Sequence, residues 1–243
     1  MAPFTDRGLA NDRTNFSNTY ISYYPFGGAI ALGLDLTLRE RSDGRVALDD
    51  FMRAMWRVHG KPAPPRPGHV ASPYTMADAE QRLAEVSGDA AFAKQFFDRY
   101  IHGRDVLDYA ALLAPAGFAL QKVNAGRAWW GDVRLDTRGG VVIAAPPAAN
   151  TPMYKAGLDI GDEIRSLDGT KTAFPDDVAA VLRRHKPGDT IAVEYADRTG
   201  SEKTVQVTLG EDPAFVLATI ESTGRPPTAA QVAFRNAWLG RKG

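Results

Sequence analysis

The spacing of apolar residues divides the chain into two unlike halves. Up to about Leu120 the apolar positions recur with a period near 3.6, which is typical of amphipathic helices. From about Gly126 to Leu209 the apolar runs are short and are separated by turn residues, as in a small sheet. A tail follows this second half. No segment repeats another, so the two halves are predicted to fold differently.

The first apolar segment fits two periods. Its alternating residues are typical of a strand, but few of them are β-branched, and pairs four residues apart also favour a helix. The residues concerned are Ile30, Leu32, Leu34, Leu36 and Leu38. We predict a mostly buried helix over residues 27–41.

Four further helices are predicted in this half. One carries an apolar stripe from Leu48 to Trp56 and has acidic residues in its first turn, where the helix dipole favours them. Beyond a proline-rich loop at residues 61–68, Thr75 has the features of an N-cap, with Asp78 in a short capping box, and that helix ends near Gly88. The others run from about residue 89 to 103 and from about 107 to 114.

The second half alternates short strands with turns. Strands are predicted at residues 133–135, 141–143 and 163–167, and the last leads into the turn dipeptide Asp168-Gly169. A helix over 174–184 opens with Pro175 in its first turn. Residues 191–195 and 204–209 form a hairpin around a turn at 198–201. The tail holds one possible helix, from Thr228 to Leu239.

Composition excludes several classes of function. The 29 basic and 29 acidic residues balance, so no overall field attracts nucleic acid or a membrane surface. The chain has no cysteine, which excludes disulfides, thiolate metal sites and a cysteine nucleophile. We find no signal peptide and no apolar stretch of membrane-spanning length. The compartment stays open, with a cytoplasmic or a periplasmic location both compatible.

The strongest motif is Lys155-Ala-Gly-Leu-Asp-Ile-Gly-Asp-Glu-Ile-Arg-Ser-Leu-Asp-Gly169. Gly157 is predicted to end a short helix in a left-handed cap, and Gly169 to take the positive φ of the following turn. Ile164 and Leu167 would enter the core. The motif resembles the A-G-L-x-x-G-D core of PDZ domains, and the elements of such a domain follow in the same order from about Gly126 to Leu209.

This resemblance implies a groove for peptide or protein C-termini. PDZ domains add an extended peptide to a sheet edge beside a helix, and loop amides hold its carboxylate. The loop matches Trp129-Trp130-Gly131, the peptide would lie along Asp132, Val133 and the residues up to Leu135, and the helix carries Val178 and Leu182. The loop lacks G-L-G-F and is closer to that of bacterial protease-linked PDZ domains. Trp129 and Trp130 could fill the groove themselves or pack the domain against its neighbour, and both alternatives remain open.

A second motif is Ile21-Ser-Tyr-Tyr-Pro-Phe-Gly-Gly28 with the apolar segment that follows it. It resembles the Y-x-K-G-A…L-x-L-D-L segment of the glycyl aminopeptidase family, thermolysin-fold zinc peptidases with a C-terminal PDZ domain. The likeness continues at residues 48–56, 97–103, 109–118 and 234–240. It implies a multi-domain α + β protein, with an all-α subdomain that is the helical half of a thermolysin-like catalytic domain, followed by a PDZ-type small β-barrel or sandwich with two helices.

The resemblance also assigns a catalytic tyrosine. In that superfamily the tyrosine of the Y-x-x-G segment donates its hydroxyl to the oxyanion as water attacks a zinc-polarised carbonyl. The matching residue is Tyr24, with Tyr23 as a weaker candidate. Phe26 stands where the family has lysine, which changes the local electrostatics. The alternative is that both tyrosines are ordinary aromatics at a helix entry.

The zinc site of that family has no counterpart in this sequence. It needs H-E-x-x-H on a helix and a downstream carboxylate. The four histidines are His59, His69, His102 and His185, and none has a histidine partner at i+4 or a glutamate after it. We therefore expect no metal ligand and no cofactor in this chain, although zinc is implied for the full-length family.

These observations predict a C-terminal fragment of a glycyl-aminopeptidase-like zinc metallopeptidase, inactive alone, whose partners are peptide C-termini and the missing N-terminal catalytic half. Its predicted domains are the helical part at 1–122, the PDZ domain at 126–210 and a tail with a short helix at 211–243. One alternative is a non-catalytic peptide-binding or scaffold protein. Another is a purely structural PDZ domain whose groove is blocked by Trp130 or by the tail.

Overall fold

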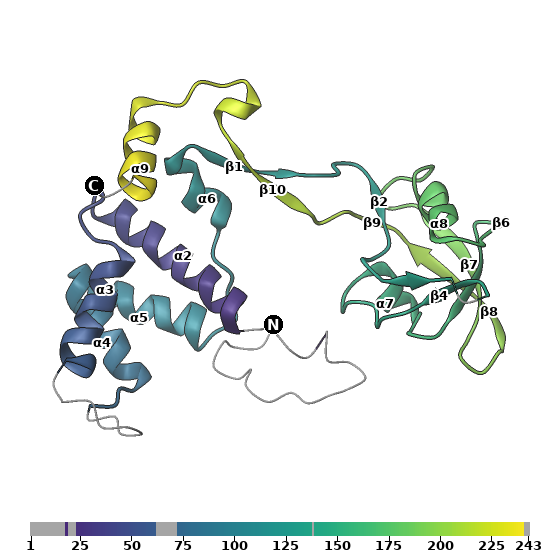
Figure 1. Cartoon of the computed structure of the whole chain (residues 1–243), viewed down its shortest axis with the longest axis horizontal. Coiled ribbons are helices and arrows are strands. Elements are labelled where there is room, and N and C mark those ends of the chain that lie inside the picture. Colours follow the sequence, from purple (N-terminus) through teal and green to yellow (C-terminus); the bar gives the residue numbers. More distant parts are fainter. Residues whose placement is uncertain (1–17, 19–22, 62–71, 138, 241–243) are drawn as a thin grey trace. The chain divides into compact units, whose positions relative to one another are not determined.

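The computed structural model describes residues 18, 23–61, 72–137 and 139–240. These residues form two compact units. The helical unit contains the described residues up to Leu120 other than Asn18, together with those from Leu217 onward. The sheet unit contains Asn18 and residues 121–216. Each unit is described by itself (Figure 1).

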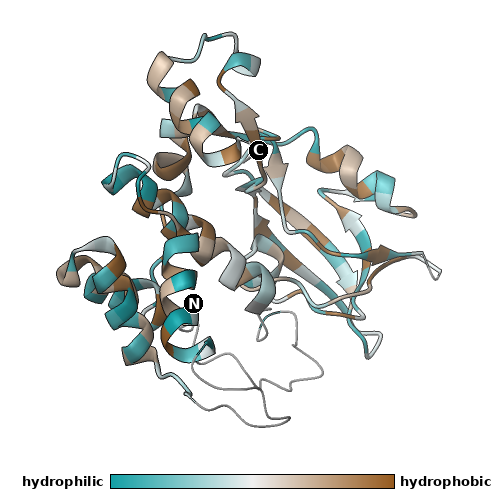
Figure 2. Ribbon diagram, turned by 60° about the vertical axis from the view of Figure 1, so that its left-hand side comes forward, coloured by the Kyte–Doolittle hydropathy of each residue, from teal (hydrophilic) through white to brown (hydrophobic). Residues whose placement is uncertain are grey.

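The helical unit is built mainly from helices that share one apolar core. They are α2 (Tyr23–Arg41), α3 (Leu48–Met55) with a π-helical turn (Trp56–Gly60), α4 (Met76–Ser87), α5 (Ala90–Phe96) with a second π-helical turn (Phe97–Ile101), and α6 (Tyr109–Leu113) with a 3-10 turn (Ala114–Ala116). Hydrophobic and hydrophilic residues alternate along these helices (Figure 2). Their apolar faces bury a cluster that includes Leu34, Leu38, Leu83 and Phe96.

The ambiguous first segment is a helix, as predicted, but it begins four residues before the predicted start. Ile30, Leu34 and Leu38, each four residues from the next, are all buried in the core of the helical unit. Gly33 lies on this helix where a Cβ atom would come within 2.3 Å of Leu107 Cδ1. A larger side chain at this position would therefore require the Leu107 side chain to move.

The predicted capping box at the start of α4 is confirmed. The Thr75 hydroxyl accepts a hydrogen bond from the Asp78 N–H at 3.2 Å, and the Thr75 N–H donates to the Asp78 carboxylate at 2.7 Å. The Thr75 hydroxyl also donates to the Asp78 carboxylate at 2.7 Å. This bond, followed by the one from the Thr75 N–H, lowers the pKa of Asp78, since both stabilise its ionised form. Gly88 ends the helix in the left-handed conformation, with φ of 69°.

The residues treated in the sequence as a separate tail are divided between the two units. Strand β9 (Gly210–Glu211) pairs with β2 (Ala128–Trp129) inside the sheet unit. Strand β10 (Phe215–Thr219) pairs with β1 (Phe118–Lys122), and the division between the units passes through both strands. The helix predicted at 228–239 is α9 (Ala229–Leu239), capped by Thr228 as expected, and it belongs to the helical unit. Backbone pairing between distant segments, which periodicity does not reveal, produces this division.

The sheet unit consists mainly of a twisted antiparallel sheet with two helices. Its strands are β3 (Leu135–Asp136), β4 (Val141–Ile143), β5 (Glu163–Leu167), β6 (Thr170–Lys171), β7 (Thr190–Ala196) and β8 (Glu202–Thr208). The order is β3-β4-β5-β7-β8, with β6 paired to β5. The helices are α7 (Pro152–Ala156) and α8 (Pro175–Leu182). The predicted hairpin is β7 and β8, and Ile164 and Leu167 lie in the core as expected.

Candidate peptide-binding site

Strand β3 is one end of the sheet, and its outer edge is open. The Ala144 N–H donates to the Arg134 carbonyl at 2.8 Å, so Arg134 turns its backbone groups toward β4. Because backbone groups alternate sides along an antiparallel strand, Val133 and Leu135 turn theirs away from β4. No hydrogen bond of the described residues uses those outward groups. A strand of another chain could form hydrogen bonds with these unpaired backbone groups.

The loop before β3 presents unpaired amides. Among the described residues, the backbone N–H groups of Gly131, Asp132 and Val133 donate no hydrogen bond, although Gly131 is buried. Buried amides without a partner are rare in folded proteins. Gly131 has φ of 140°, and a Cβ atom there would lie 3.2 Å from Thr151 Cβ. The loop therefore has a conformation that suits glycine, with three successive amides available to an anion.

Helix α7 holds this loop in place. The Met153 N–H donates to the Trp130 carbonyl at 2.9 Å, and the Thr151 hydroxyl caps α7 by accepting from the Tyr154 N–H. Gly157 ends α7 with φ of 82°, as predicted from the motif. The buried Asp162 carboxylate then accepts the Asp159 N–H at 2.9 Å, and burial raises the pKa of Asp162. Helix α7 and the residues of the 155–169 motif thus help to fix the backbone around the loop at Gly131.

Apolar side chains of β3 and α8 contribute to one core. Val133, Leu135 and Leu182 are half-buried against the core of the sheet unit, and Val178 is fully part of it. Val178 and Leu182 lie on α8 one turn apart, as the sequence predicted. These residues would give an added peptide an apolar surface for alternate side chains.

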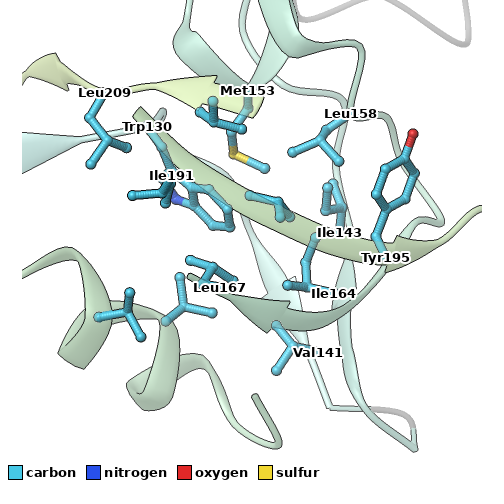
Figure 3. Packing of buried hydrophobic residues seen from close by; sticks show 14 of the residues in the cluster. Trp130, Val141, Ile143, Met153, Leu158, Ile164, Leu167, Ile191, Tyr195 and Leu209 are labelled. Carbon is cyan, nitrogen blue, oxygen red and sulfur yellow. The ribbon is translucent and has the colours of Figure 1, made fainter. Parts of the chain in front are cut away.

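Trp129 and Trp130 have different surroundings in the structure. Trp130 is 4% exposed and lies in the unit's own core, in the same cluster as Ile191 (Figure 3). Trp129 lies in β2 and donates its indole N–H to the Asp132 carboxylate at 3.0 Å. Adjacent residues of extended backbone face opposite sides, so Trp130, which follows β2, enters the core while Trp129 does not.

His185 approaches two carboxylates that the sequence did not predict as its neighbours. His185 follows the C-terminal end of α8, with Nε2 3.5 Å from the Asp168 carboxylate and Nδ1 3.5 Å from that of Asp189. The His185 ring therefore lies between the turn after β5 and the turn before β7. An isolated histidine gives no sequence signal for such a role, because the two carboxylates come from distant turns.

The candidate catalytic tyrosines lie at the start of α2. Tyr24 is 91% exposed. Tyr23 begins the helix, but its side chain lies outside the described residues. His69 also lies outside them, whereas His59 contacts the Ser72 carbonyl and the Tyr74 ring. No group of three or more metal-binding side chains occurs among the residues that the structure describes. None of the described helices is long and apolar enough to cross a membrane.

Comparison with known proteins identifies the class of the sheet unit. The PDZ domain family model matches residues 117–209, so the chain contains a PDZ domain. Over 98 residues, the chain is 34% identical to a probable periplasmic serine endoprotease DegP-like protein of Pseudomonas fulva. They are 36% identical, over 70 residues, to the serine protease PepD of Mycobacterium tuberculosis. These matches cover 40% and 29% of this chain but only 20% and 14% of the relatives.

A solved structure resembles both halves of the chain. The aminopeptidase N family protein from Idiomarina loihiensis matches 93% of this chain with a TM-score of 0.59 and 21% identity. The match covers 37% of that protein's length. At this identity the likeness concerns the fold alone.

Proposed function

We propose that the PDZ domain binds the C-termini of peptides or proteins, with the peptide added as a strand to the outer edge of β3. The unpaired amides of Gly131, Asp132 and Val133 are the observation that carries this proposal, because they form a site for a terminal carboxylate. Val133, Leu135, Val178 and Leu182 would receive the peptide's apolar side chains.

A titration with matched peptides tests this binding. One peptide ends in a free carboxylate and the other in an amide, and both have the same apolar sequence. Hydrogen bonds to a charged group contribute about 1.5–3 kcal/mol, so the free acid is expected to bind roughly tenfold tighter or more. Equal affinity for the two peptides, or no saturable binding of either, would contradict the proposal.

We also propose that the chain is the C-terminal part of a zinc metallopeptidase of the glycyl aminopeptidase type. Two observations support it: the motifs around Tyr24 and Phe234, and the likeness in fold to an aminopeptidase N family protein across both units. In this proposal the metal would be held by a part of the protein outside this chain, because the sequence has no H-E-x-x-H motif. In such an enzyme the exposed Tyr24 hydroxyl would donate a hydrogen bond to the developing oxyanion.

Two measurements test this second proposal. The chain alone, supplied with zinc, is expected not to cleave glycyl substrates, and measurable zinc-dependent cleavage would refute that expectation. In a longer chain that carries H-E-x-x-H, Tyr24→Phe is expected to lower kcat by about 10²–10³-fold. Tyr23→Phe is measured beside it, because Tyr23 is the weaker candidate for the same role, and a loss of kcat for Tyr23→Phe alone would assign the role to Tyr23. An unchanged kcat for Tyr24→Phe would remove the proposed role.

A further inference from the structure

The opposite end of the PDZ sheet has a second open edge. Among the described strands, β8 pairs only with β7, through seven successive positions without a register shift. The Leu209 N–H donates to the Asp189 carbonyl at 2.8 Å and the Asp197 N–H to the Ser201 carbonyl at 3.0 Å. Odd-numbered residues of β8 therefore face β7, and the even-numbered ones turn their backbone groups outward.

The outward groups belong to Thr204, Gln206 and Thr208. Within the described part of the chain, no hydrogen bond uses their backbone N–H or carbonyl groups. Folded proteins usually protect such an edge with proline, a bulge or charged side chains. From Val205 to Thr208 this strand has no proline, no bulge and no charge. The edge is therefore able to accept another strand.

A hollow of about 510 Å³ lies beside this edge. Pro152, Lys155 and Ala156 of α7 line one side, and Gln206 and Thr208 line the other. Trp129 contributes its ring, which its bond to Asp132 holds in place. The arrangement of a helix beside a free strand edge resembles that of β3 and α8, but its lining is polar.

The charge of the hollow defines the chemistry of its partner. Lys155 is exposed and forms no ion pair within the described residues. None of the described residues that line the hollow is acidic, and Asn150 adds further hydrogen-bond donors. A ligand with a carboxylate would therefore complement this surface.

We propose that β8 is a second strand-addition site, which takes an extended segment of a partner protein with a glutamate or aspartate directed at Lys155. The backbone groups recur at every second residue, and only another extended chain matches that spacing. The segment needs no free C-terminus, since strand pairing and a side-chain carboxylate near Lys155 are enough to hold it. This site differs from the proposed groove at β3, although Trp129, which precedes the loop at Gly131, lines its hollow.

The test uses two capped peptides, acetyl-Thr-Val-Glu-Val-Thr-amide and the same peptide with lysine in place of glutamate. Neither has a terminal carboxylate for the Gly131 loop. Added to the ¹⁵N-labelled full chain, the glutamate peptide is expected to cause saturable shifts at the Thr204, Gln206 and Thr208 amides. The lysine peptide is expected to bind about fivefold more weakly, as an exposed ion pair contributes up to about 1 kcal/mol.

Two variants make the test decisive. Lys155→Glu is expected to reverse the preference between the peptides without changing the strand geometry. Gln206→Pro removes one outward donor at an edge position that tolerates proline, and should weaken binding by about tenfold or more. If Gln206→Pro does not fold, the Lys155→Glu reversal still decides. Shifts confined to β3 and α8, no saturable shifts, or the same shifts caused by concentration-dependent dimerisation without peptide would overturn the proposal.

Discussion

The two units leave different kinds of surface open. The helical unit exposes apolar side chains around a hollow of about 460 Å³, lined among others by Met52, Trp56 and Tyr74. The PDZ domain instead has backbone groups at Gly131, Leu135 and Gln206 that no other described residue pairs with. Backbone donors and acceptors have fixed spacing and therefore specify the geometry of a partner. An apolar hollow specifies little beyond volume, so function is easier to infer from the PDZ domain than from the helices.

The largest expected effects test whether each unit has a core of its own. Leu83→Ala in the helical unit and Leu167→Ala in the PDZ domain each remove a side chain with no exposed surface. Each should cost about 2–5 kcal/mol of unfolding free energy. Only Leu167→Ala is expected to weaken binding of a carboxylate-ended peptide. Denaturant unfolding measures the loss of stability, and a peptide titration measures the loss of affinity. An equal loss of affinity for Leu83→Ala would contradict the view that the two units have separate cores.

The next effect concerns how α9 is held in the helical unit. The Arg235 guanidinium donates to the Ala116 carbonyl at 2.7 Å, to the Gly117 carbonyl at 2.9 Å and to the Glu221 carboxylate at 2.8 Å. Arg235→Ala should cost about 2–3 kcal/mol, as these are hydrogen bonds from a charged group. Limited proteolysis should then cut near α9. Arg225→Ala is the control, and comparable protease sensitivity for both variants would contradict this role.

A smaller effect separates a glycine that needs only positive φ from one that also needs space. Gly131→Ala should cost about 1–3 kcal/mol and weaken peptide binding, because its φ of 140° and the nearby Thr151 both oppose a side chain. Gly126 has φ of 73°, but a Cβ atom added there would meet nothing within 4 Å. Gly126→Ala should therefore be the milder change and leave affinity intact. Isothermal titration calorimetry of both variants with the peptide checks this. Unchanged binding by Gly131→Ala would contradict the assignment of this loop as the carboxylate-binding loop.

The smallest effect is expected on the open face of the helical unit. Trp56 is 56% exposed, so Trp56→Gln should change the unfolding free energy by no more than about 0.5 kcal/mol. It should reduce binding of an apolar dye. Trp130→Ala, at a position 4% exposed, should cost about 3–5 kcal/mol in the PDZ domain. A large loss from Trp56→Gln would mean that its surface is structural rather than open.

The sequence predicted well those features that depend on neighbours in the chain. The capping box of Thr75 and Asp78, the left-handed Gly157 and Gly169, and the β7–β8 hairpin are confirmed because each is fixed by a few consecutive residues. The start of α2 was predicted too late, since two successive glycines at 27–28 interrupt the local helical signal. Strand β10 was missed because it is defined by its pairing with β1, about a hundred residues away.

The candidate site shows the same division. By itself the sequence determined that a PDZ domain is present and that Val178 and Leu182 lie one turn apart on a helix, because these depend on motif and period. Only the tertiary structure decided that Trp130 is core, that His185 lies between two carboxylates, and which backbone groups of β3 and β8 remain unpaired among the described residues. The physical reason is that burial and strand pairing depend on segments brought together by folding, which local spacing does not encode.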